Sequence, residues 1–376
     1  MEFRDLKAQY NKYKNEIKSA TIGVFEDTNF ISGPIVKKFE ERLAGYVNVK
    51  HCITCANGTD ALSLVLTAWG IGKGDAVFVP DFTFFATAEV VSYVGATPIF
   101  VDVDPKTFNI NPVELEKKIK ETISENKLTP KVIIPVDLFG LLADYSTIEK
   151  IANKFNLLIL EDGAQGFGAD YNGKKACSFG DAATTSFFPA KPLGCYGDGG
   201  AIFTNDDEFA KLLESLRVHG KGEDKYDNVR IGVNSRLDTI QAAILDVKLD
   251  ALINHELQDI NVIFRKYNEK LNTYVEVPFI PNGYTSSFAQ YTIKLVDKEQ
   301  RDNLKAFLQK NNIPSMIYYT KTMHNQTAFK ELHNKDKDYP ISTSLCNTVL
   351  SLPMHPYLED EEIEYISSKI IEFLNS

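Results

Sequence analysis

Short apolar runs alternate with longer amphipathic runs from about residue 50 to residue 205. This alternation is typical of strands joined by crossover helices in a mostly parallel sheet. The apolar runs predict seven strands, at His51–Cys55, Ala76–Val79, Thr97–Val101, Val132–Val136, Leu157–Leu160, Ala183–Phe188 and Ala201–Thr204. The amphipathic runs predict helices at Ala61–Trp69, Ala86–Val94, Pro112–Ile123 and Tyr145–Phe155. We therefore expect an α/β fold with one seven-stranded, mostly parallel sheet flanked by helices.

The pattern changes after residue 206. Apolar residues three and four apart predict helices at Glu208–Arg217 and over Thr239–Leu271. Further on, strands are predicted at Glu276–Ile280, Gln290–Leu295, Ser315–Tyr319 and Val349–Leu352, with helices at Lys298–Lys310 and Asp360–Leu374. A chain of 376 residues is too long for one ordinary core. We therefore predict a large domain over residues 1–250 and a smaller α+β C-terminal domain over residues 251–376.

The charge balance argues against nucleic acid as a partner. A formal net charge of −10 does not provide the broad basic face that displaces counterions from phosphates. No apolar stretch approaches the 18 residues of a membrane span, and Met1–Leu6 does not resemble the start of a signal peptide. An odd number of cysteines, five, is typical of reduced thiols. The expectation is a cytoplasmic protein with no membrane partner.

Cys52 and Cys55 form a C-x-x-C pair, for which a zinc or redox role has to be weighed. They lie in an apolar, strand-like run, and no second pair stands at zinc-ribbon distance. We therefore predict buried structural thiols and no metal site, since free cysteine commonly packs as a small hydrophobic residue.

Ligands of open parallel sheets bind outside the carboxyl ends of the strands. The segment Asn57–Leu62 follows one predicted strand and opens a helix. Free amides at the helix N-terminus, with the Thr59 hydroxyl, are suited to a phosphate dianion. The alternative is a plain turn followed by a helix cap.

A second candidate site follows the apolar run Leu157–Leu160, where Asp162 stands at the mouth of a predicted buried strand. An unpaired buried carboxylate costs several kcal/mol, roughly, so Asp162 needs a cation, a metal or a solvated position. A protonated pyridine nitrogen would satisfy it. The alternative is that Asp162 caps the next helix.

Lys191 lies between Pro189 and Pro192, just beyond a predicted strand and just before a glycine-rich turn. Desolvation in an apolar pocket lowers the pKa of a lysine, and the free amine then attacks carbonyls. The alternative is a surface lysine in a loop. The glycine spacing around Gly194 and Gly200 matches neither G-x-G-x-x-G nor a Walker loop, which argues against nucleotide-phosphate binding there and against a nicotinamide enzyme.

These three sites, in this order, resemble the DegT/DnrJ/EryC1/StrS sugar aminotransferases, a family of fold-type I pyridoxal-phosphate (PLP) enzymes. The resemblance spans essentially the whole chain, through Gly33-Pro34, Asn57–Ala61, Pro80–Phe84, Glu161–Gln165, Ser186–Gly200, Gly232–Asp238 and Ser351–Pro356. The most specific segments are Ser186–Gly200 and Asn234–Asp238. The branch that it resembles most acts on UDP-linked 3-keto N-acetylhexosamine uronates.

The resemblance implies a role for each matching residue. Lys191 is expected to bind pyridoxal 5'-phosphate covalently, and Asp162 to pair with its ring nitrogen. The other expected cofactor ligands are Gln165 at the ring hydroxyl, Phe84 on the ring face, and Gly58, Thr59 and Ser186 at the phosphate. Asn234 is expected to reach the phosphate of the neighbouring subunit's cofactor and Arg236 its substrate, so the resemblance implies a homodimer with shared active sites. Tyr318 and Tyr319 are expected to line the sugar-nucleotide site.

The reaction implied is transfer of an amino group, with glutamate as donor, to a keto group of a UDP- or dTDP-linked hexose, with pyridoxamine 5'-phosphate as the amino carrier. Two positions depart from relatives: Tyr318 stands where the uronate branch has histidine, and Asp137 where many relatives have histidine. Two alternatives remain. A keto-sugar dehydratase of this fold has histidine in place of Lys191, and a non-catalytic regulatory protein would have lost part of the cofactor set.

Overall fold

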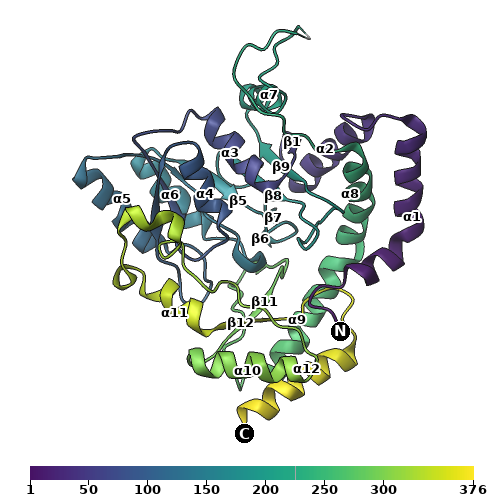
Figure 1. The fold of residues 1–376 in the computed structure, drawn as a ribbon, viewed down its shortest axis with the longest axis vertical. Helices are drawn as coiled ribbons and strands as arrows, with labels where there is room; N and C mark the ends of the chain where they lie inside the picture. The colour runs from purple at the N-terminus through teal and green to yellow at the C-terminus, as the bar shows by residue number, and fades with distance from the viewer. Residues whose placement is uncertain (225) are drawn as a thin grey trace.

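The computed structural model describes residues 1–224 and 226–376 and contains the predicted seven-stranded sheet (Figure 1). The strand order is β1-β9-β8-β5-β4-β2-β3. Strand β9 is antiparallel to β1 and β8, and the other neighbours are parallel, so the mostly parallel α/β fold is confirmed. The strands are β1 His51–Cys55, β2 Asp75–Pro80, β3 Thr97–Val101, β4 Thr129–Ile133, β5 Leu158–Asp162, β8 Ala182–Ser186 and β9 Gly200–Thr204.

Helices cover both faces of this sheet. Successive residues of β2 alternate between two cores: Ala76 and Phe78 face one, and Val77 and Val79 face the other. Burial on both faces explains why the strands read as short continuous apolar runs. The first core is closed by α2 Pro34–Val47, α5 Pro112–Glu125, α6 Tyr145–Phe155 and α8 Thr239–Ala251. The second is closed by α3 Gly58–Ala68, α4 Ala86–Tyr93 and α7 Asp207–Leu216.

The C-terminal part has its own core around Tyr267, Leu304 and Ile366, all almost fully buried. It contains α9 Leu257–Leu271, α10 Lys298–Lys310, α11 Pro340–Thr348, α12 Asp360–Leu374 and the antiparallel pair β11 Tyr291–Lys294 and β12 Val349–Leu352. A π-helical segment, Leu252–Glu256, joins α8 to α9 without a break. The predicted division at residue 250 falls in this continuous helical run and stays a prediction.

Two predicted C-terminal strands are wrong. The ranges Glu276–Ile280 and Ser315–Tyr319 each form a single bridge, Glu276 to Lys294 and Met316 to Ser351. Pro278 lies inside the first range and Pro314 directly precedes the second. Proline cannot donate a hydrogen bond to a ladder, which explains why pairing does not extend.

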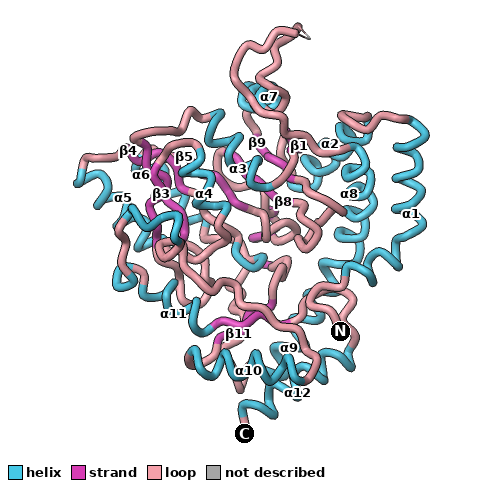
Figure 2. The backbone as a smooth tube through the Cα atoms, viewed as in Figure 1, coloured by secondary structure: helices cyan, strands magenta, loops and turns pink. Residues whose placement is uncertain are grey.

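A long helix, α1 Leu6–Asp27, packs along α8, and neither α1 nor α2 was predicted (Figure 2). Short elements complete the fold: β6 Asp170–Tyr171, β7 Lys174–Lys175 and β10 Tyr284–Thr285 form a small sheet, and 3-10 turns lie at Leu138–Gly140, Thr327–Leu332 and Asp336–Asp338. Cys52 and Cys55 are buried free thiols, as predicted. Over the described residues, no helix has the length and apolar character needed to cross a bilayer.

Candidate active site

The ends of β5 and β8 and the start of α3 meet at one edge of the sheet. Strands β5 and β8 are parallel neighbours, so Asp162 and Ser186 both lie at their carboxyl ends. A Cβ atom on Gly58 would lie 2.7 Å from the Cβ of Ser186, so the first turn of α3 touches the end of β8. Segments more than 100 residues apart in sequence are thereby brought to one place, as the strand-end argument predicts.

The start of α3 is a capped helix whose first two amides remain free. The Asn57 side chain accepts a hydrogen bond of 2.8 Å from the amide of Asp60, as an N-cap does. The preceding amides, those of Gly58 and Thr59, have no partner within a helix, because helix geometry leaves the first N–H groups free. The cap and the phosphate site are therefore compatible, and the helix dipole adds to the attraction for an anion.

Asp162 is a buried carboxyl, only 4% exposed. It accepts hydrogen bonds from Thr87 Oγ1 at 2.8 Å and from the amide of Ala164 at 3.2 Å. Burial raises its pKa, while the bonds from Thr87 and Ala164 act in the opposite direction. No helix begins after Asp162, since residues 164–168 form turns, so the helix-cap alternative is wrong. Within the described ranges no cation is hydrogen-bonded to this carboxyl, which leaves it able to accept from a protonated ring nitrogen.

Lys191 lies in the irregular loop between β8 and β9 and is partly buried. Its amide donates to the Phe188 carbonyl at 2.8 Å, and its own carbonyl accepts from Arg4 Nη2 at 2.8 Å. Burial lowers the pKa of Lys191 to about 8; Asp162 opposes this shift and Arg4 adds to it. The partial burial of Lys191 argues against an ordinary, fully solvated surface lysine. An amine with this pKa is neutral in about a tenth of molecules at pH 7, far more than an ordinary lysine, and the neutral form can attack a carbonyl.

Gln165 and Tyr319 are joined by a hydrogen bond of 3.2 Å from the amide Nε2 to the phenol oxygen. The Gln165 Oε1 atom accepts from the amide of Phe139 at 2.9 Å, so this side chain is held from both ends. The Tyr319 ring lies 6.5 Å from that of Phe84, whose side chain is 54% exposed. The exposed face of Phe84 is therefore available to a planar ligand.

Tyr318, predicted to line the sugar-nucleotide site, is half-buried beside Tyr319, with ring centroids 5.7 Å apart. Its other aromatic neighbour is Phe3, at 6.1 Å. The start of the chain therefore lies against this side of the site.

Asn234 and Arg236 are not brought to Lys191 by any hydrogen bond or ion pair among the described residues of one chain. Asn234 is exposed, and its backbone pairs with Val218. Between them, Ser235 donates to Asp60 Oδ2 at 2.6 Å, which anchors this segment to the start of α3. Arg236 forms no ion pair with Asp238 or with any other described residue, so its guanidinium remains available.

Sequence reasoning missed two contacts of this site, those of Thr87 and Arg4. Thr87 lies in the first turn of α4, and nothing in its local sequence signals a bond to Asp162, 75 residues away. Arg4 precedes α1 and reaches Lys191 across 187 residues. Both contacts arise only from tertiary packing.

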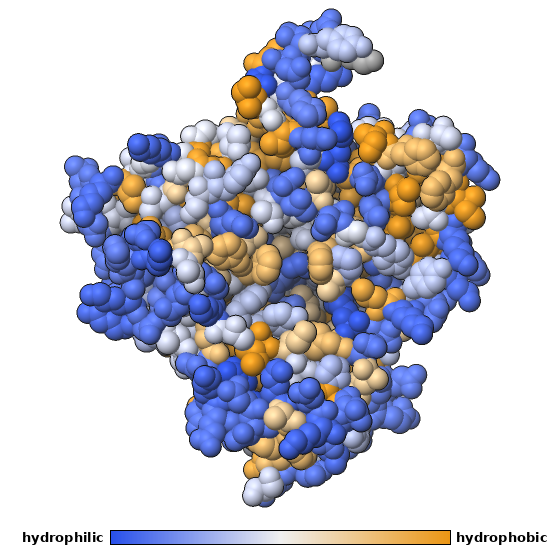
Figure 3. Space-filling view, viewed as in Figure 1, coloured by the Kyte–Doolittle hydropathy of each residue, from blue (hydrophilic) through white to orange (hydrophobic). Residues whose placement is uncertain are grey.

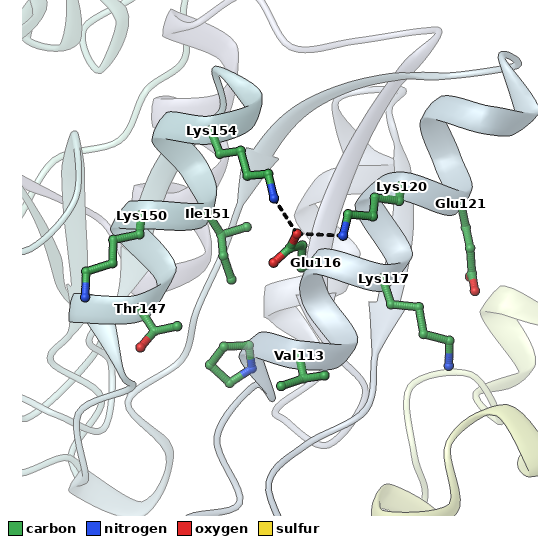
Figure 4. Close-up of a pocket in the computed structure, with 10 residues that line it drawn as sticks. Val113, Glu116, Lys117, Lys120, Glu121, Thr147, Lys150, Ile151 and Lys154 are labelled. Atoms are coloured by element: carbon green, nitrogen blue, oxygen red, sulfur yellow. Dashed lines mark hydrogen bonds and ion pairs between the residues drawn. The ribbon is translucent and has the colours of Figure 1, made fainter.

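A separate surface groove of about 640 Å³ lies between α5 and α6 (Figure 4). Four lysines line it, but Lys120 and Lys154 both bind Glu116, at 2.7 and 2.8 Å, and Lys117 binds Glu114 at 2.9 Å. Its charges are largely paired, and it contains none of the predicted site residues.

The residues at the strand ends suit pyridoxal phosphate. A buried carboxyl without a cationic hydrogen-bond partner fits the ring nitrogen, an amine of lowered pKa fits the carbonyl, and a helix N-terminus beside Ser186 fits the phosphate.

Comparison with known proteins agrees with this geometry. A model of the DegT/DnrJ/EryC1/StrS aminotransferase family matches residues 11–371. The UDP-2-acetamido-2-deoxy-3-oxo-D-glucuronate aminotransferase of Pseudomonas aeruginosa is 42% identical, over 98% of this chain and 99% of its own. The dTDP-3-amino-3,6-dideoxy-alpha-D-galactopyranose transaminase of Aneurinibacillus thermoaerophilus is 39% identical over 99% and 98%. A protein of Geobacillus stearothermophilus named pleiotropic regulatory protein is 43% identical over 98% and 97%.

Solved structures give the same picture. A DegT DnrJ EryC1 StrS aminotransferase from Brucella abortus has a TM-score of 0.96 and 52% identity, over the whole of both chains. NtdA from Bacillus subtilis, with bound cofactor PMP, has a TM-score of 0.88 and 28% identity, over 97% of this chain and 83% of its own.

Proposed function

The chain belongs to the DegT/DnrJ/EryC1/StrS aminotransferase family and is a PLP-dependent nucleotide-sugar aminotransferase. On this premise we propose that glutamate is its amino donor and that a UDP- or dTDP-linked 3-keto hexose is its acceptor. The uronate and deoxy-sugar enzymes among its relatives support a keto group on a nucleotide-linked hexose. A role in surface-polysaccharide synthesis, including lipopolysaccharide, and a cytoplasmic location complete the proposal.

The observation that carries the catalytic assignment is the position of Lys191 and Asp162 at one edge of the sheet. Asp162 ends β5, and Lys191 lies in the loop that follows β8, the parallel neighbour of β5. The amine and the carboxyl are near enough to affect each other's pKa. When bound, PLP supplies a carbonyl for amines and a ring that withdraws electrons. Asp162 Oδ accepts the hydrogen bond of the ring nitrogen and keeps that nitrogen protonated. Lys191 Nζ, being neutral in part, is the base that accepts and returns a proton beside the reacting carbon.

The remaining site residues bind and orient. Gly58 and Thr59 at the start of α3, with Ser186, hold the phosphate. Gln165 donates to the ring hydroxyl, and its position is fixed by the Phe139 amide and Tyr319. Phe84 offers its exposed face to the ring, and Tyr318 and Tyr319 line the sugar-nucleotide side.

We propose that the active sites are shared across a homodimer, with Asn234 and Arg236 of one chain completing the site of the other. The unpaired guanidinium of Arg236 supports this, because a planar group with several donors suits phosphate or sugar oxygens. Exposed apolar side chains support an interface as well. Ile22, Phe25, Phe30 and Ile31 are 42–58% exposed at the end of α1 and just after it, where Figure 3 shows an apolar patch.

Two alternatives are less well supported. A dehydratase of this fold lacks the lysine that stands here as Lys191. A regulatory role is the name given to one relative, but a purely non-catalytic protein would have no need for a buried Asp162 beside an amine of lowered pKa.

One experiment tests the whole assignment. The purified protein with PLP should show an absorbance band at about 400–430 nm, as expected for a lysine-bound cofactor. Glutamate should remove this band, and a panel of UDP- and dTDP-linked keto-sugars should restore it. A chain with no such band is not the enzyme proposed, and a band insensitive to glutamate excludes glutamate as donor.

A further inference from the structure

Arg4 lies in direct contact with the loop that carries Lys191. Its Nη2 atom donates a hydrogen bond of 2.8 Å to the Lys191 carbonyl oxygen. The segment around it is held in place by the Phe3 carbonyl, which accepts from the amide of Met354 at 3.3 Å, and by the contact of Phe3 with Tyr318. The start of the chain is therefore packed between the Lys191 loop and the C-terminal part.

The Arg4 guanidinium has no carboxylate bound to it. No described residue forms an ion pair with it, and its Nη1 atom is buried without a hydrogen-bond partner. Burial lowers its pKa, and Glu256 and Tyr357 oppose that shift from a distance. Glu256 itself accepts hydrogen bonds from Gln9, at 2.8 Å, and from Tyr357. The positive charge of Arg4 is thus not cancelled by direct contact, and its field reaches neighbouring groups.

Two further titratable groups lie near this charge. Lys248 donates to the Gly194 carbonyl in the same loop, and burial, then Arg4, lower its pKa to about 8. Burial lowers the pKa of His355 too, and Arg4 contributes in the same direction, against Asp5. The basic groups facing this region are thus Arg4, Lys191 and Lys248, and the acidic groups are Asp5, Asp162 and Glu256; His355, with its lowered pKa, is neutral near pH 7. Burial raises the pKa of Tyr196 and Tyr357, so both are neutral near pH 7.

We propose that Arg4 is a positioning residue for Lys191: its guanidinium fixes the Lys191 main chain and its permanent charge favours the neutral form of the Lys191 amine. The inference rests on the proposed role of Lys191 as the cofactor lysine. Arginine is suited to this task because its charge does not titrate at any working pH, so the effect is constant. In a region poorly screened by water, a fixed positive charge disfavours a second one nearby.

The test uses four variants. Arg4→Met removes the charge and the hydrogen bond, Arg4→Gln removes the charge but keeps a donor, and Arg4→Lys keeps a charge. Lys7→Met is the matched control, since Lys7 is an exposed cation three residues along the chain. The cofactor is removed, and the rate at which trinitrobenzenesulfonate modifies Lys191 is followed against pH by peptide mass spectrometry.

We expect the pH of half-maximal reactivity to rise by about one unit in Arg4→Met and Arg4→Gln. It should stay close to wild type in Arg4→Lys and unchanged in Lys7→Met. If circular dichroism shows that Arg4→Met does not fold, the reactivity midpoint of Arg4→Gln tests the proposal in its place. An unchanged midpoint in a folded, charge-removing variant overturns the proposal.

A second readout separates this proposal from the assignment of Lys191. The 400–430 nm band of the loaded enzyme is titrated with base and acid in the same variants. A wild-type protein without the band refutes the role of Lys191, whereas a normal wild-type band whose titration does not differ in Arg4→Met refutes only the role of Arg4.

Discussion

Thr87 Oγ1 donates a hydrogen bond of 2.8 Å to Asp162 Oδ2, joining α4 to the end of β5. Both side chains are buried, at 1% and 4% exposure. The bond orients the carboxyl without neutralising it, because a hydroxyl brings no charge. Asp162 is thereby fixed in place while keeping its capacity for a cationic partner.

Asp162→Asn should reduce transamination by orders of magnitude, because an amide cannot hold the ring nitrogen in its protonated form. The charge-assisted bond that is lost is worth about 1.5–3 kcal/mol. Steady-state kinetics and the cofactor content of the variant check this. Thr87→Val, which keeps the charge, should have the milder effect. A loss below about tenfold in Asp162→Asn, ~1.4 kcal/mol in barrier, would count against the assigned role.

Lys191→Ala should abolish turnover without unfolding the protein, since the lysine supplies chemistry and little core packing. It lies in an irregular loop and donates no side-chain hydrogen bond to a described residue. Circular dichroism and thermal unfolding should match wild type, and the variant should still bind pyridoxamine phosphate. Near wild-type turnover by Lys191→Ala would show that the central assignment is wrong.

Mixing inactive Lys191→Ala subunits with inactive Arg236→Ala subunits should restore activity. A shared site places both lesions in one of the two sites of the mixed dimer and leaves the other intact. The mixture is assayed after conditions that allow exchange, and exchange itself is followed with tagged subunits. If mixed dimers form but remain inactive, the two residues do not serve sites on different chains.

Asp137→Asn should make the folding stability of the protein less sensitive to rising pH. Asp137 and Glu161 are fully buried, and each carboxyl affects the pKa of the other, so we expect them to share a proton. Burial, followed by the charge of Glu161, raises the pKa of Asp137, and burial raises that of Glu161 from 4.5 to about 7. The stability associated with the raised pKa of Glu161 is complete below about pH 4.5 and is lost as the pH rises through about 7.

An asparagine amide donates to Glu161 without a titrating proton, and its oxygen can still accept from Tyr145, as Asp137 does at 2.9 Å. The melting temperature of Asp137→Asn should therefore exceed that of wild type at pH 8 by a few °C, on the order of 1–3 kcal/mol, with a smaller difference at pH 5. Asp144→Asn, at an exposed cap of α6, is the control and should follow wild type. Parallel pH profiles for Asp137→Asn and wild type would contradict the shared proton.

Local patterns in the sequence determined where the helices and strands begin and end. The predicted bounds of Thr97–Val101, Tyr145–Phe155 and Lys298–Lys310 are those of the structure. The two helices begin at aspartates that accept hydrogen bonds from the backbone within one turn, Asp144 and Asp297. Such caps and apolar periods act over a few residues, so they are legible in the chain itself. The positions of Asp162 at the end of a strand and of Lys191 in the loop after another strand follow from the same local order.

Only the tertiary structure decided which groups meet. The contacts of Asp162 with Thr87 and of Lys191 with Arg4 span 75 and 187 residues. The charged stretch 333–339 buries Tyr339 against the His324 ring, with ring centroids 4.6 Å apart. Such contacts depend on how whole helices and strands pack, and packing is the sum of many weak, non-directional apolar contacts. No short segment determines this packing. The strand ends can therefore be predicted from the sequence, but the residues that contact Asp162 and Lys191 cannot.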